Sequence, residues 1–162
     1  MIRHFDITDL AKINVQDEQM CEDSEHWYMF DDDDTIVFED GERVLAIVRP
    51  LFQSGGKVQL VALVGRDCGY KGVPMFRQMR KLIEEWLSCE DINRVEFTTQ
   101  SGFKQADRLA ELLGFKKEGV LRKYYNGIDF NIWGGLNNEF DICWYGGSRS
   151  YIGSRLFSIQ TR

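Results

Sequence analysis

The sequence has little of what would mark a membrane, secreted or zinc-binding protein. It contains no run of about 18 or more apolar residues, so a transmembrane helix is not expected. The opening MIRHFDITDL is too polar for a secretory signal peptide. The four cysteines form no C-x-x-C pair and the two histidines lie far apart, so a structural zinc site has little support. We therefore expect reduced thiols and a cytoplasmic protein.

Charge is unevenly distributed along the chain of 162 residues, whose net charge is −6. Residues 1–42 contain 14 acidic and 2 basic side chains, whereas the remainder contains 12 acidic and 18 basic ones. The acidic excess is greatest at Asp31–Asp34, and the basic excess surrounds Arg66 and Lys71. Because the acidic first third would repel a polyanion, nucleic-acid binding is not expected. A small anionic ligand near Arg66 and Lys71 is compatible with this distribution.

The stretch Lys57–Leu87 has the pattern of a buried strand, a glycine-bearing turn and an amphipathic helix. The apolar run Val58–Val64, rich in β-branched residues, is typical of a covered strand. Gly69 and Gly72 punctuate the turn, and Pro74 suits the first turn of the helix. Such a junction offers backbone N–H groups and the positive end of a helix dipole to an anion. The sequence therefore predicts a phosphate-binding turn; the alternative is a tight turn beside a solvated basic helix face.

The rest of the pattern predicts an α/β (α+β) fold with a mixed, mostly antiparallel sheet flanked by helices. A short helix capped by Asp6, Thr8 or Asp9 is expected to reach Ile13. Pro50 is expected to end a strand pairing or to mark a sheet edge. The other expected strands are 1–7, 35–38, 43–49, 94–99, 121–124 and 128–133, and a helix is expected over 104–113 with Gly114 as its stop.

The pattern changes after residue 136, where aromatic and arginine residues continue without a clear period. We expect residues 1–136 to form one domain and residues 137–162 a C-terminal extension. That extension carries too many aromatic residues for a flexible linker, so we expect it to dock on a partner or to pack back as an extra strand. The aromatic cluster His26–Phe30 is interpreted as core packing, with one wall of a substrate pocket as the alternative.

Two segments resemble the motifs of the Gcn5-related N-acetyltransferase (GNAT) superfamily. Arg66–Lys71, followed by Gly72, is similar to the Q/R-x-x-G-x-G/A signature, although Lys71 stands where the signature has its final small residue. Ala106–Phe115 is similar to the helix motif A-x-x-L-Y-x-x-L-G-F, with Ala110 in place of the tyrosine. The order of strands and helices over roughly residues 1–136 also matches the family layout. The chain is thus similar to a degenerate member of this superfamily.

The resemblance implies that acetyl-CoA binds with its pyrophosphate against the turn and its pantetheine arm between the fourth and fifth strands. The implied cofactor-binding residues are Leu63, Val64, Arg66, Gly69, Tyr70, Lys71 and Gly72. Backbone N–H groups near Leu63 and Val64 would polarise the thioester carbonyl. Glu96 and His26 are the candidate general bases by residue type. Ala110 removes the tyrosine that often protonates the leaving thiolate in the family.

The function implied by the resemblance is transfer of an acetyl group from acetyl-CoA to an amine. The acidic first third favours a cationic acceptor such as a lysine or a polyamine. The alternative is a non-catalytic structural or interaction protein that keeps the fold and docks on a larger assembly through residues 137–162. For this alternative, the layout is distantly similar to acetyltransferase-like proteins of short-tailed bacteriophages, some of them virion components. The protein would then be phage-encoded and lie in the host cytoplasm or the virion.

Overall fold

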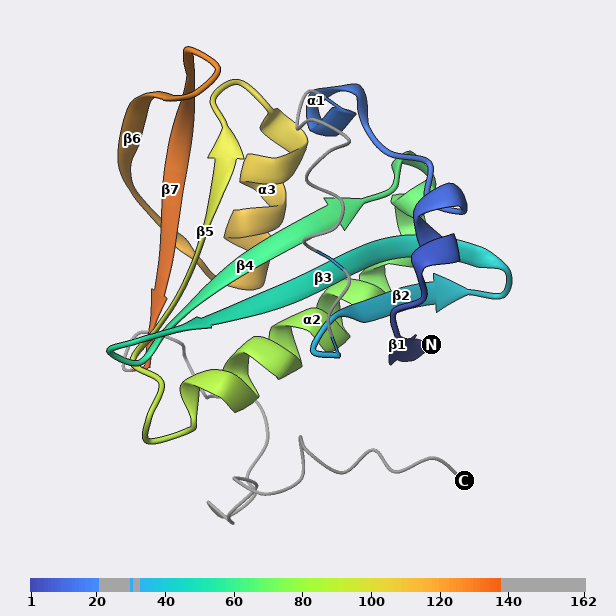
Figure 1. Cartoon of the computed structure of the whole chain (residues 1–162), viewed down its shortest axis with the longest axis horizontal. Coiled ribbons are helices and arrows are strands. Elements are labelled where there is room, and N and C mark those ends of the chain that lie inside the picture. Colours follow the sequence, from blue (N-terminus) through green and yellow to red (C-terminus); the bar gives the residue numbers. More distant parts are fainter. Residues whose placement is uncertain (21–29, 31–32, 138–162) are drawn as a thin grey trace.

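A single seven-stranded sheet organises the chain in the computed structural model, which describes residues 1–20, 30 and 33–137 (Figure 1). The strand order is β1-β2-β3-β4-β5-β7-β6. The strands are β1 Ile2–His4, β2 Ile36–Asp40, β3 Arg43–Gln53, β4 Lys57–Val64, β5 Arg94–Gln100, β6 Lys116–Tyr125 and β7 Ile128–Leu136. Neighbouring strands pair antiparallel except β4 and β5, which are parallel. The predicted mixed, mostly antiparallel sheet is confirmed.

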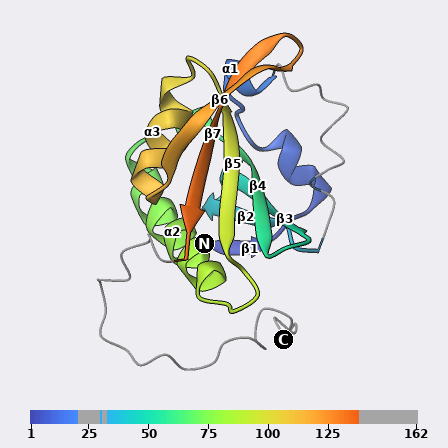
Figure 2. The same cartoon turned by 90° about the vertical axis from the view of Figure 1, so that its left-hand side faces the viewer.

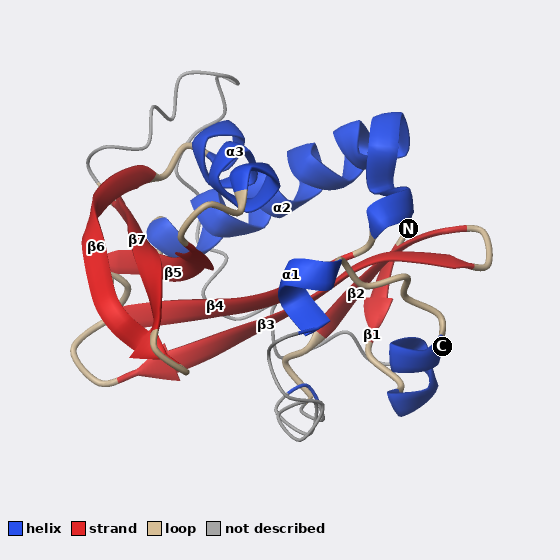
Figure 3. Ribbon diagram, turned by 90° about the horizontal axis from the view of Figure 1, so that it is seen from above, coloured by secondary structure: helices blue, strands red, loops and turns tan. Residues whose placement is uncertain are grey.

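Helices cover both faces of this sheet. They are α1 Asp17–Met20, α2 Gly72–Leu87 and α3 Lys104–Leu113, with 3-10 helices η1 Ile7–Ala11 and η3 Arg66–Lys71. Figures 2 and 3 show α2 and α3 together on one face and α1 on the other. None of the helices in the described part of the chain is long and apolar enough to cross a membrane.

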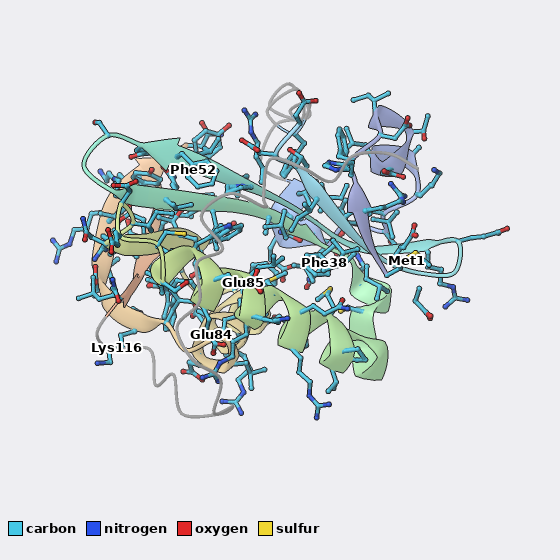
Figure 4. All side chains as sticks on the ribbon, turned by 90° about the horizontal axis from the view of Figure 1, so that it is seen from below. Met1, Phe38, Phe52, Glu84, Glu85 and Lys116 are labelled. Carbon is cyan, nitrogen blue, oxygen red and sulfur yellow. The ribbon has the colours of Figure 1, made fainter. Side chains whose placement is uncertain are left out.

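The core has two layers because side chains on a strand point alternately to opposite faces. The larger layer, under α2 and α3, includes Val58, Ile83 and Val95, which are fully buried. Figure 4 shows Phe38 in this layer, between β2 and α2, whereas Glu84 and Glu85 lie on α2. The smaller layer lies on the opposite face and includes Ile13, Val15, Val37, Ile47 and Leu63.

Local signals predicted the central elements well. β4 occupies the predicted range. The predicted amphipathic helix is α2, which buries Met79, Ile83 and Trp86 as its spacing indicates, with Met75 buried in place of the half-buried Phe76. α3 ends as predicted at Gly114, whose φ of 93° lies in the left-handed region that favours glycine. Each of these signals involves residues close together in the chain, which explains why the sequence alone was sufficient to predict these elements.

The predicted helix through Ile13 is wrong in type and length. The structure has the 3-10 helix η1, capped by Asp6, and it ends at Ala11. Ile13 and Val15 then form isolated bridges with Val44 and Gly65. These two residues are buried because they lie beside the sheet, which is a long-range contact. In the sequence, their positions after Leu10 look like the apolar spacing of a helix.

Pro50 does not end a strand, although it does stand next to an open edge. β3 continues to Gln53 and Pro50 stays in register with Leu60 of β4. On its other side, the pairing of β3 with β2 stops at Val48. Because Gly65 N–H donates to the Leu45 carbonyl, odd-numbered residues of β3 bond to β4, and the nitrogen of Pro50 faces away from β4. Proline thus costs the β3–β4 ladder no hydrogen bond.

Candidate functional site

Strands β4 and β5 separate soon after they start. They pair only over Lys57–Gln59 and Arg94–Glu96, and Figure 1 shows them diverging toward their C-terminal ends. A cavity of about 480 Å³ fills the opening, a volume within the usual range for small-molecule sites. The divergence of the two strands therefore creates the main candidate site in the described part of the chain.

The cavity has an apolar wall and a polar mouth. The apolar wall is formed by α2, α3 and β5 through Phe76, Met79, Phe97, Leu109 and Leu113. The polar residues that line the cavity from α1 and the segment before it are Gln16, Glu18 and Gln19. Tyr124 and Tyr125, from the β6–β7 hairpin, complete the lining at another side. The site can thus accept a ligand with a long apolar or amide-bearing arm.

A network of polar side chains links β5 to α3 and to β7, its neighbour on the side away from β4. The Trp133 indole N–H donates to Thr99 Oγ1 at 2.9 Å, and the Thr99 hydroxyl donates to Asp107 Oδ1 at 2.6 Å. The Asn131 amide also donates to Asp107 Oδ1, at 3.0 Å. These bonds tie β5 to α3 and β7, because Asp107 belongs to α3 and Asn131 to β7. They hold β5 on the side away from β4.

The open edge of β4 presents backbone hydrogen-bonding groups to the cavity. Gly65 N–H donates to Leu45 of β3, so the alternation of an antiparallel ladder turns Ala62 and Val64 toward the opening. Val64 N–H donates to Gln19 Oε1 at 3.1 Å, and Gln19 Nε2 donates to the Ala62 carbonyl at 2.9 Å. Gln16 Nε2 donates to the Val64 carbonyl at 3.1 Å. The Gln19 amide therefore pairs with β4 as the backbone of a neighbouring strand would.

The two residues expected to polarise a carbonyl are placed differently. The N–H of Val64 faces the opening, whereas strand alternation turns that of Leu63 toward β3. The side chain of Leu63 is buried on the opposite face of the sheet. Of the pair, Val64 alone can offer its N–H to a ligand in the cavity.

The turn after β4 is tight because of the packing around Gly72. A Cβ atom at this position would lie 2.5 Å from the Cys68 sulfur and 3.0 Å from the Phe76 ring. Gly69 has φ 39° and ψ −139°, a backbone conformation that residues other than glycine rarely adopt, and it lines the cavity. Burial raises the pKa of the Cys68 thiol, which disfavours the thiolate form that a nucleophile needs. Among the described residues of the turn, Arg66, Cys68 and Gly69 border the cavity.

Arg66 is engaged by the N-terminal segment. Its Nε–H donates to the Val15 carbonyl at 2.9 Å, and its guanidinium forms an ion pair with Asp17. Tyr70 and Lys71 belong to η3 by their backbone, while their side chains lie outside the described part of the structure. The predicted phosphate-binding cation Arg66 thus borders the cavity but faces α1.

The geometry around Glu96 does not suit a general base. Glu96 lies where β4 and β5 are still paired, and its carboxylate binds Lys57 at 2.9 Å and Arg94 at 2.7 Å. Burial opposes ionisation, but the hydrogen bonds from Arg94 and Lys57 outweigh it, so the pKa of Glu96 is lowered. Glu96 is thus a carboxylate paired with two cations, and it is not among the residues that line the cavity. His26, the other candidate, lies outside the described residues.

Gln16 and Gln19 were not identified from the sequence as residues of the site. The two glutamines lie in a polar segment with no period or motif, so nothing local predicts their contact with β4. Ala110 is fully buried in the core under α2 and α3. Position 110 therefore contributes packing here.

Comparison with known proteins identifies the fold. No protein-family model and no curated protein sequence matches the chain. Solved structures do match: an acetyltransferase of the GNAT family from Bacillus anthracis is 12% identical with a TM-score of 0.66, covering 85% of this chain and 95% of that one. A spermidine N-acetyltransferase SpeG chimera from Vibrio cholerae and hSSAT is 15% identical with a TM-score of 0.64, covering 85% and 95%. Mycobacterium smegmatis RimJ in complex with CoA-disulfide is 13% identical with a TM-score of 0.56, covering 66% and 54%. The chain has the GNAT fold.

Proposed function

We propose that this protein is an N-acyltransferase that uses acetyl-CoA as acyl donor and an amine as acceptor. The observation that carries the proposal is the opening between β4 and β5, with the Val64 N–H turned into a cavity of about 480 Å³. A neighbour with this fold, RimJ, was solved with CoA-disulfide, which supports a CoA ligand for the fold.

The residues present fit such a donor. The apolar slot between β4 and β5 would take the pantetheine arm, with the open edge of β4 pairing with its amides. The Val64 N–H would donate to the thioester carbonyl, where negative charge develops as the amine attacks. The backbone of the Gly69–Gly72 turn, at the start of α2, would face the pyrophosphate.

A cationic acceptor is favoured by the acidic groups at the other side of the opening. Glu18 lines the cavity, and Asp17 of the same helix is exposed. Asp33 and Asp34, the described part of the predicted acidic run, are exposed as well, although they are not among the residues that line the cavity. One neighbour of this fold is a spermidine N-acetyltransferase, which agrees with a polyamine or a lysine as acceptor. Carboxylates at the entrance would raise the local concentration of such an amine.

The test is calorimetric titration of the purified protein with acetyl-CoA. Ala106 lines the cavity from α3, so Ala106→Trp should fill the slot and abolish binding. Ala11→Trp adds the same side chain at an exposed position on η1 and should bind as the parent does. Absence of binding at millimolar acetyl-CoA both by the parent protein and by Gln19→Ala, which frees the Val64 N–H, would refute the proposal.

A non-catalytic protein that keeps the fold is the second candidate. It is favoured by two observations: Ala110 is buried at the position of the family's tyrosine, and Glu96 is held in an ion-pair cluster away from the cavity. Acetyl-CoA binding without acetyl transfer to spermidine or to a lysine peptide would favour this candidate over the enzyme.

A further inference from the structure

We infer that Gln19 closes the cleft against the acyl donor, so that acyl-CoA and the Gln19 side chain compete for the same backbone groups of β4. The inference rests on the proposed function, since it concerns access to the same cavity. Gln19 would act as a built-in substitute for the donor's amide groups, and the Gln16–Gln19 segment would have to withdraw before acyl-CoA pairs with the strand.

The contact is complementary in both directions. The Gln19 amide oxygen accepts from Val64 N–H and its nitrogen donates to the Ala62 carbonyl, the pattern that one strand residue offers another. Gln16 takes the next acceptor along the same edge, the Val64 carbonyl. The closed form therefore satisfies the edge of β4 that the divergence from β5 leaves open. A ligand that needs the Val64 N–H cannot use it while Gln19 holds it.

A second contact holds the same segment at the turn. Arg66 donates from Nε to the Val15 carbonyl and pairs with Asp17. Withdrawal of the segment would break the contact between Asp17 and Arg66, which lies at the start of the turn proposed for the pyrophosphate. Opening would thus release the Val64 N–H, the Ala62 carbonyl and a guanidinium together.

The stretch of residues 16–19 is suited to withdraw because none of its four side chains is apolar or buried. α1 has 4 residues, Asp17 has 80% of its side chain exposed, and Gln16 and Gln19 are only partly buried. The exposed ion pair contributes little to stability, so the amide contacts decide the balance. When the binding-competent form is only partly populated, the apparent affinity for a ligand falls by that fraction. Loss of the two Gln19 hydrogen bonds should therefore tighten donor binding on the order of tenfold.

The experiment compares the parent protein with Gln19→Ala and with Gln78→Ala, a matched change at an exposed position of α2. Acetyl-CoA affinity is measured by calorimetry, and exchange of the Val64 amide hydrogen by NMR or mass spectrometry. We expect Gln19→Ala to bind about tenfold more tightly and to exchange the Val64 hydrogen faster, while Gln78→Ala matches the parent in both.

The outcomes separate the two proposals. Binding by Gln19→Ala but not by the parent would support both, since the glutamine would then block the site. Equal or weaker binding by Gln19→Ala, with the parent binding, would overturn the competition while leaving the acyl-CoA site intact. Failure of all three proteins to bind would overturn the proposed function, and the competition with it. Unchanged Val64 exchange in Gln19→Ala would overturn the contact itself.

Discussion

Replacement of Gly72 by alanine tests whether close packing, rather than backbone flexibility, requires glycine at the start of α2. Gly72 does not have a positive φ, so alanine can adopt its backbone conformation. The added Cβ would lie 2.5 Å from the buried Cys68 sulfur and 3.0 Å from two atoms of the Phe76 ring. The first distance is too short for any real contact, so the sulfur or the helix start has to move.

Two effects of opposite sign determine how much Gly72→Ala changes the free energy of unfolding. Alanine is favoured over glycine inside a helix by up to about 1 kcal/mol, and less is expected at the first position. Overpacking of a well-packed core costs roughly 1–3 kcal/mol. We therefore expect Gly72→Ala to lower the free energy of unfolding by about 1 kcal/mol. If propensity dominated, the same change would raise it.

A double-mutant cycle with Cys68→Ala isolates the clash, because it removes the sulfur that the new methyl group would meet. The coupling free energy between positions 68 and 72 should be about 1–2 kcal/mol, with the double variant more stable than the sum of the single changes predicts. Urea denaturation provides the free energies, and Gly119→Ala serves as control, since its Cβ would meet only an Ile132 methyl group at 3.8 Å. A stabilised Gly72→Ala, or additive effects, would refute the packing explanation.

Two further changes probe the fold around the site. Asp9 is fully buried and accepts hydrogen bonds from Arg3 at 2.6 and 2.7 Å, so Asp9→Asn should lower the free energy of unfolding by about 3 kcal/mol in urea denaturation. The hydrogen bond from Arg3 holds the pKa of Asp9 far below its usual range. This contribution is therefore complete above the unfolded pKa of about 4 and is lost as the pH falls below it, so the variant should show a flatter acid denaturation profile. Gly114→Ala should cost about 1 kcal/mol in the same assay because φ is 93°, and a value near that of Gly119→Ala would contradict it.

The sequence predicted elements whose signals lie within one or two turns of the chain. The apolar run of β4, the stripe of α2 and the Gly114 stop of α3 are local patterns, and each corresponds to the observed element. The family motifs also indicated the GNAT fold, which the solved structures show although no protein-family model and no curated protein sequence matches the chain. The prediction of a helix through Ile13 failed because Ile13 is apolar for contact with the sheet, although its place in the sequence fits the spacing of a helix.

The candidate site was only partly visible in the sequence. The glycines of the turn were found, and Gly69 does line the cavity. Glu96 was selected by residue type, but its charge partners Lys57 and Arg94 become neighbours only when two distant strands pair. The chemistry of a residue type alone therefore does not show where its side chain lies or which charges it pairs with.

By itself, the sequence determined the alternation of buried and exposed positions along β4, the limits of α2 and α3, and the glycine-bearing turn, because these depend on neighbours a few residues away. Only the tertiary structure decided that β4 and β5 diverge, that Val64 rather than Leu63 faces the opening, and that Gln19 covers that edge from 45 residues away. The physical reason is that strand pairing and edge hydrogen bonds are long-range. A glutamine side chain carries the same donors and acceptors everywhere, and only the fold chooses its partner.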